Sequence, residues 1–320
     1  MKLNSIILFS LLFLYGCVQN TIAIHVSPNG SFDMAIHAHG DENDILDNDF
    51  PITNILNNPN WSITSTIDSN DVDTHDIIAK KHFSPNANIP QNFSINKKLK
   101  IHPMLKHDID VTYRNWILYK TYTINILFHS REVYDKYPKL INLIKDPEGS
   151  HKGWMQEVFF YLFQETLHRS QIEFNQKAII QRELNTWLQQ EVATKTDSTI
   201  FEYFDDLKEE GLDLMMHPIN PNLYNEIDSI FNYLETEYQV TQKLIDDDFE
   251  IKITLPGILK TSNHKEKNLD TLKWIFNLND FMNSDYEINA KSIITYKSRS
   301  IIVALLSFII LIILIIKKQQ

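Results

Sequence analysis

The feature that most constrains this chain is an apolar segment near its C-terminus, residues 301–316, which contains no charged side chain. As an α-helix the run is about 24 Å long, close to the hydrocarbon core of a bilayer, about 30 Å. Lys297 and Arg299 precede it and Lys317 follows it, and such long basic side chains extend from helix ends to the headgroups. We therefore expect residues 299–320 to be a transmembrane anchor with a short tail, rather than a buried core helix.

The N-terminus has the layout of an export signal. Lys2 precedes an apolar segment at residues 6–15, which is too short for an ordinary spanning helix. Leu14, Gly16 and Cys17 then stand where a bacterial lipobox has its cleavage site. We expect residues 1–17 to be a lipoprotein signal peptide, with lipidation of Cys17, which becomes the first residue of the mature chain. A plain signal peptide or an uncleaved anchor is the alternative.

The two ends together predict a location. Export of the N-terminus places the body outside the cell or in the periplasm, with the residues after the anchor in the cytoplasm. A chain threaded through the cytoplasmic (inner) membrane stays there. We expect a single-pass bacterial membrane protein whose contacts with membrane lipid are Cys17 and the 301–316 helix.

Composition excludes several classes of function. Hydrophobic residues make up 43% of the chain and charged residues 22%, as in folded globular proteins. A net charge of −11 argues against a nucleic-acid partner. The chain has 7 glycines and contains no GxGxxG, GxxxxGK[ST] or GxSxG motif, so the usual signatures of nucleotide binding and serine hydrolysis are absent from the sequence. We expect no cofactor and no enzymatic activity.

Hydrophobic periodicity divides the rest of the chain into three parts. Two alternating segments around Asn29-Gly30 predict a β-hairpin, and further strands are predicted at 61–67, 75–83 and 109–128. Helical spacing then predicts helices at 154–192, 201–216 and 223–244, before strands at 249–255, 271–278 and 286–296. The expected fold is α+β: a β-rich domain built from residues 18–147 and 248–298, an α-helical insertion at 148–247 and a C-terminal transmembrane helix.

The framing elements resemble the LppM-like family of bacterial membrane lipoproteins. The resemblance is carried by residues 22–39 around Gly30-Ser31, by residues 251–257 ending in Leu-Pro-Gly, by residues 261–263, by Trp274 and by residues 286–290 ahead of the final helix. It covers about half of the chain and does not include the helical middle. It implies an extracytoplasmic, non-enzymatic α+β lipoprotein concerned with envelope lipids, and it supplies no catalytic residues.

His37, His39 and Asp41 are the strongest candidates for chemistry. Residues i and i+2 of a strand share a face, so both imidazoles could bind one metal ion, with Asp41 as an oxygen ligand. His-x-His-x-Asp occurs in metallohydrolases, which need further ligands from other strand ends. The alternative interpretation is a solvated polar face of a half-buried hairpin, and we assign no metal site on this pattern.

Glu165 and His168 have the i, i+3 spacing of half a di-iron site. A complete site needs a second such pair and two more glutamates on neighbouring helices. Glu148 and His151 repeat the spacing in a segment predicted to be a loop. An exposed polar helix face explains the first pair more simply.

Three functions remain open. The leading hypothesis is a non-catalytic envelope lipoprotein that binds a protein or lipid partner, with the helical insertion as the binding element. The alternatives are a metal-dependent hydrolase that uses His37, His39 and Asp41, and a purely structural envelope protein. The sequence does not identify the partner or the oligomeric state.

Overall fold

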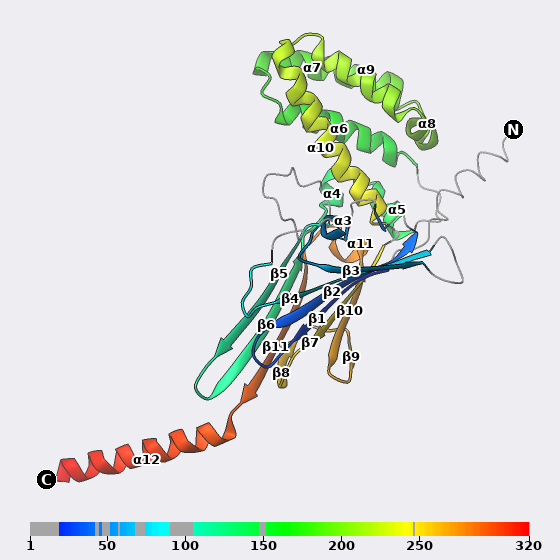
Figure 1. The fold of residues 1–320 in the computed structure, drawn as a ribbon. Coiled ribbons are helices and arrows are strands. Elements are labelled where there is room, and N and C mark those ends of the chain that lie inside the picture. Colours follow the sequence, from blue (N-terminus) through cyan, green and yellow to red (C-terminus); the bar gives the residue numbers. More distant parts are fainter. Residues whose placement is uncertain are drawn as a thin grey trace.

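The computed structural model contains both helices and strands, as expected for an α+β protein (Figure 1). It describes residues 19–41, 45–46, 52–56, 58–67, 74–89, 105–146, 152–245 and 247–319. The strands form two sheets, and most of the helices stand together beyond one end of them. Cys17, Glu148 and His151 lie outside the described residues.

The larger sheet has seven strands and joins the two halves of the chain. The order is β3-β4-β2-β1-β7-β10-β9, where β1 is parallel to β7 and the other pairs are antiparallel. Its strands are β1 (Gln19–Val26), β2 (Phe32–Asp41), β3 (Ser62–Ile67), β4 (Thr74–Phe83), β7 (Asp248–Thr254), β9 (Glu266–Asn268) and β10 (Thr271–Asn277). Because β1 pairs with β7, the β-rich part is built from both flanks of the chain, as the sequence predicts. The short helix α3 (Ile52–Leu56) lies between β2 and β3 in the chain.

The predicted hairpin at Asn29-Gly30 is confirmed. Gly30 has φ +91°, a conformation that L side chains rarely adopt, and its N–H donates to the carbonyl of Ser27 at 2.9 Å. The ring of Tyr113 lies against Gly30, where an added Cβ would come within 2.3 Å of it. Both the backbone conformation and the contact with the second sheet therefore require glycine here.

The smaller sheet has the order β5-β6-β11-β8, with strands β5 (His107–Asn115), β6 (Tyr119–Phe128), β8 (Ile258–Ser262) and β11 (Tyr286–Thr295). The prediction of one strand over 109–128 is wrong, because a turn at Trp116, Ile117 and Leu118 divides it into β5 and β6. Aromatic and β-branched residues favour strands, but here they occupy an exposed turn. The prediction also omitted β8, β9 and the short helix α11 (Leu278–Phe281).

The core lies between the sheets and is rich in aromatic rings. The ring of Phe128 on β6 is 4.7 Å from that of Phe276 on β10, and Phe276 is 5.5 Å from Phe249 on β7. Trp274 is fully buried and donates its indole N–H to Asn263 at 3.0 Å. The alternating burial of β1 and β2 gives each strand one core face and one open face.

Helices occupy the middle of the chain. Before residue 148 there are already α4 (Val133–Lys136) and α5 (Leu140–Lys145). The helical module, residues 154–243, contains α6 (Trp154–Arg169), α7 (Phe174–Trp187), the π-helical turn η2 (Leu188–Val192), α8 (Asp197–Glu202), α9 (Phe204–Met216), the 3₁₀ turn η3 (Pro221–Leu223) and α10 (Tyr224–Lys243). The prediction of one helix over 154–192 is therefore wrong. Ser170 has an extended backbone conformation, which ends α6.

Phe163 lies at the centre of the helical module. Its ring is 4.8 Å from Phe231 on α10, 5.5 Å from Trp187 on α7 and 5.9 Å from Phe159 one turn earlier. Gly211 on α9 lies against the same ring, where an added Cβ would be 2.3 Å from it. Four helices thus meet at one buried side chain.

The C-terminal helix α12 (Lys297–Gln319) starts directly after the last strand. Tyr296 is the single residue between β11 and α12, and its N–H donates to the carbonyl of Leu118 at 2.9 Å. Among the described residues, α12 is the only helix long and apolar enough to cross a membrane, and none of the span Lys297–Ile315 is buried against the body. Figure 1 shows α12 at the end of the sheets opposite the helical module.

Candidate functional site

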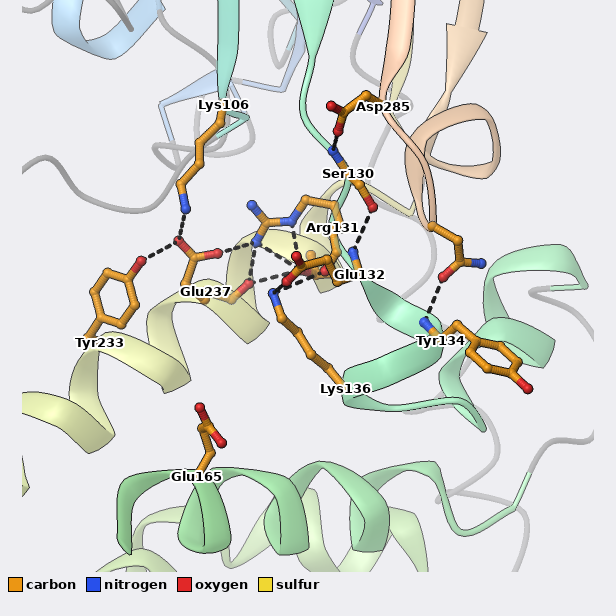
Figure 2. A network of polar contacts seen from close by, with 12 residues as sticks. Lys106, Ser130, Arg131, Glu132, Tyr134, Lys136, Glu165, Tyr233, Glu237 and Asp285 are labelled. Carbon is orange, nitrogen blue, oxygen red and sulfur yellow. Dashed lines mark hydrogen bonds and ion pairs between the residues drawn. The ribbon is translucent and has the colours of Figure 1, made fainter. Parts of the chain in front are cut away.

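A buried arginine joins the β-rich domain to the helical module. Arg131 follows β6, is 4% exposed and points toward α10 (Figure 2). Its Nε donates to the Thr241 hydroxyl at 3.1 Å, and its Nη2 donates to the Glu237 carbonyl at 2.7 Å. Nη2 also lies 3.0 Å from Glu237 Oε2. This one guanidinium therefore holds two consecutive turns of α10.

The carboxylate of Glu237 is surrounded by donors. Besides Arg131, Lys106 lies 3.2 Å from Oε1, and the Tyr233 hydroxyl donates to the same oxygen at 3.2 Å. Burial alone raises the pKa of Glu237, but the positive charges of Arg131 and Lys106 outweigh it and hold the pKa below its ordinary value. Glu237 is therefore ionised at neutral pH.

The backbone around Arg131 is fixed as well. The Arg131 N–H donates to the carbonyl of Phe281 at 3.1 Å, and the Ser130 N–H donates to Asp285 Oδ1 at 2.8 Å. The Tyr134 N–H donates to Asn283 Oδ1 at 2.6 Å. Figure 2 shows these contacts converging from β6–α4, from α10 and from the segment before β11. The network thus ties together three segments that are far apart in the sequence.

The chemistry of this network is that of a structural junction. Nearby phenols stay neutral, because burial raises the pKa of Tyr161 to about 12 and also raises the pKa of Tyr137. Glu237 is ionised and engaged by three donors, so it does not offer a proton. A buried pair of this kind positions elements; removal of one partner leaves an uncompensated charge.

The structure brings His37 and His39 together on the open face of β2, as predicted, but both point at Asp76, which was not among the predicted site residues. His37 Nε2 is 2.6 Å and His39 Nδ1 is 3.0 Å from the same oxygen, Asp76 Oδ1 on β4. The hydrogen bond with His37 is the largest influence on Asp76 and lowers its pKa. Asp41 lies further along β2, opposite Thr74. In the described parts of the chain, no group of three or more His, Cys, Asp or Glu is arranged to hold a metal ion.

The sequence placed Asp76 in a strand but did not indicate which residues it would contact. It lies within the strand predicted at 75–83, but its register with β2 was not predictable from either strand alone. The pairing of His39 with Asp76 sets that register and places the carboxylate between the two imidazoles.

Glu165 and His168 form only a surface pair. Glu165 Oε1 is 2.6 Å from Arg169 Nε, and Glu165 Oε2 is 3.8 Å from the exposed His168. The carboxylate of Glu165 is thus engaged by Arg169 on its own helix, and the structure gives a surface ion pair where the spacing suggested half of a di-iron site.

No protein-family model matches the chain, and no curated protein matches it. Among solved structures, the folded domain of LppM from Mycobacterium tuberculosis, determined by NMR, matches 89% of this chain and 95% of its own, with 9% identity and a TM-score of 0.32. The neighbour is a weak one. Membership of the LppM-like family therefore stays a prediction.

Proposed function

We propose that this protein is a non-catalytic, membrane-anchored envelope lipoprotein that presents its helical module to a protein or lipid partner outside the cytoplasm. One observation carries the proposal: α12 continues from β11 at one end of the sheets, and the helical module stands at the other end. With ten residues at about 3.4 Å each, β11 alone accounts for roughly 34 Å between the two. The body therefore acts as a rigid spacer between anchor and module.

The helical module has surface features suited to a partner. Phe174, at the start of α7, is 85% exposed, and Phe201 in α8 and Tyr203 just after it are about half exposed. Exposed aromatic side chains are enriched at protein interfaces, where they supply much of the binding free energy. The Arg131 network supports the same role, because it fixes the orientation of α10, and with it the module, relative to the sheets.

The location is tested by thiol labelling of spheroplasts with a membrane-impermeant maleimide. Phe174→Cys is expected to be labelled in intact spheroplasts, and Gln319→Cys only after lysis. Unsubstituted protein is the control: an acylated Cys17 stays unlabelled in both conditions and incorporates radioactive palmitate, whereas Cys17→Ser does not incorporate it. The reverse pattern, with Gln319→Cys labelled first, would place the body in the cytoplasm and contradict the proposal.

The partner is tested by photo-crosslinking in cells. A benzophenone amino acid at Phe174 is expected to give a discrete adduct, because this side chain projects from the helical module. The same amino acid at Lys267, an exposed residue of β9 at the opposite end of the body, is the matched control and should not give this adduct. The proposal is wrong if position 174 gives no adduct or if both positions give the same one.

A further inference from the structure

Exposed apolar side chains gather at the end of the sheets where α12 begins. Trp116 is 50% exposed and Ile117 77% in the β5–β6 turn, Ile258 is 62% exposed at the start of β8, and Leu269 is 88% exposed in the β9–β10 turn. The three segments are far apart in the sequence. Figure 1 shows the β5–β6 turn, β8 and β9 reaching the same end of the body. We call this the tip end.

Strand pairing places each segment there independently. Tyr119, at the start of β6, pairs with Thr295, the last residue of β11 before α12. Ile258 pairs with Ile293 on the same strand. Leu269 precedes Thr271, which pairs with Thr254 at the end of β7. The apolar residues therefore share one end of the two sheets with the base of α12.

Basic side chains are fixed around the same place. The guanidinium of Arg299, in the first turn of α12, lies 4.2 Å from the ring centre of Tyr296. The Lys120 ammonium lies 5.9 Å from the centre of that ring and donates to the carbonyl of Pro28 at 2.9 Å. Lys297 begins the helix. The tip end thus combines exposed apolar and aromatic side chains with basic side chains close to them.

This combination fits the headgroup layer of a bilayer. Tryptophan and tyrosine concentrate at membrane interfaces, and lysine and arginine pair there with lipid phosphates. The largely exposed side chains of Ile117 and Leu269 gain free energy when they move from water into that layer. Because a single residue separates β11 from α12, a helix that enters the bilayer brings the tip end to its surface.

We propose that the tip end, through Trp116, Ile117, Ile258 and Leu269, lies in the headgroup layer of the bilayer that α12 spans. The partner is a lipid surface, and the proposal goes beyond the function proposed above, because it concerns how the body sits on its own membrane. The helical module then faces away from that membrane, whichever side of it the body occupies.

Tryptophan fluorescence tests this in full-length protein reconstituted in nanodiscs whose lipids carry bromine near the headgroup. Trp61, Trp154 and Trp274 are buried and Trp187 is partly buried in the helical module, so Trp116 is the tryptophan expected to meet the quencher. The quenched fraction of the emission should fall at least twofold in Trp116→Phe. In that background, Leu269→Trp should restore quenching, and Phe174→Trp, equally exposed but at the far end, should not.

Two outcomes would overturn the proposal. One is equal quenching of wild-type protein and Trp116→Phe, or of Leu269→Trp and Phe174→Trp, which would fit a tip end occupied by a protein instead. The other is protein that fails to remain with the nanodiscs, because α12 then does not enter a bilayer. A body on the cytoplasmic side would refute the function proposed above and leave the quenching pattern unchanged, so the two failures are distinguishable.

Discussion

Replacement of Glu237 by Ala is expected to lower the free energy of unfolding by about 3–5 kcal/mol. The substitution leaves the guanidinium of Arg131 buried at the junction without its counter-charge, and Lys106 and Tyr233 lose their acceptor. Chemical denaturation of the purified protein in detergent measures the change. The rate of backbone amide hydrogen exchange should rise first in α10 and in the segment that follows β6, because the Arg131 network joins these two segments.

Two further variants show whether the effect comes from the unpaired charge. The double variant Arg131→Met with Glu237→Leu should lose less than Glu237→Ala, because apolar groups then fill the site. Glu132→Gln removes the charge that pairs with Lys136 at an exposed carboxylate, and should change the free energy of unfolding by only about 0–1 kcal/mol. An equal loss in the single and double variants would show that packing, not charge, holds the junction.

The same carboxylate predicts a dependence on pH. The pKa of Glu237 is lower in the folded protein than in the unfolded chain, where it is about 4.3. Its contribution to stability is therefore fully present above that value and is lost as the pH falls through the folded pKa. When the pH is lowered from 6 to below the folded pKa of Glu237, the free energy of unfolding should fall further in the wild-type protein than in Glu237→Gln.

Phe163→Ala is expected to cost about 3–5 kcal/mol, the usual range for removal of a buried aromatic side chain. The ring contacts Phe231, Trp187 and Phe159, and it fills the space left by Gly211, so the cavity opens where four helices meet. The loss should appear as weaker hydrogen-exchange protection in α6, α7, α9 and α10, measured against unchanged protection in β1 and β7.

Phe174→Ala is the matched control for Phe163→Ala. It removes the same side chain from an 85% exposed position, so the free energy of unfolding should change by no more than about 0.5 kcal/mol. A comparable loss in both variants would mean that Phe174 is covered in the protein in solution, by a partner or by a second copy of the chain.

Local patterns predicted the parts of the fold that depend on neighbouring residues. The hairpin at Gly30 follows from two alternating segments and one turn, and each is readable within a few residues. The prediction of one strand over 109–128 failed for a related reason. Trp116 and Ile117 are large and apolar, and such residues favour strands. Both are exposed in the turn, which fits the lipid contact proposed for the tip end.

The functional contacts were harder to predict because they depend on tertiary pairing. Arg131 and Glu237 are separated by 106 residues in the sequence. A signal was present, since Glu237 stands between Leu234 and Tyr238 on the buried face of α10, where an isolated charge is unusual. Its partner, however, comes from a loop. Asp76 is a similar case, because only the register of β2 with β4 places it between His37 and His39.

The position of the start of β1 limits how the protein can be oriented on a membrane. Gln19 pairs with Asp248, beside the end of α10, and Cys17 is two residues earlier, within about 7 Å of extended chain. Fatty acids on Cys17 would emerge at that end, a strand length of roughly 26 Å from α12. One leaflet can receive them together with α12 only when the strands lie flat along its surface. If the body stands upright as proposed, fatty acids on Cys17 therefore enter a membrane surface other than the one that receives α12, and incorporation of palmitate together with quenching of Leu269→Trp is the result expected from that arrangement.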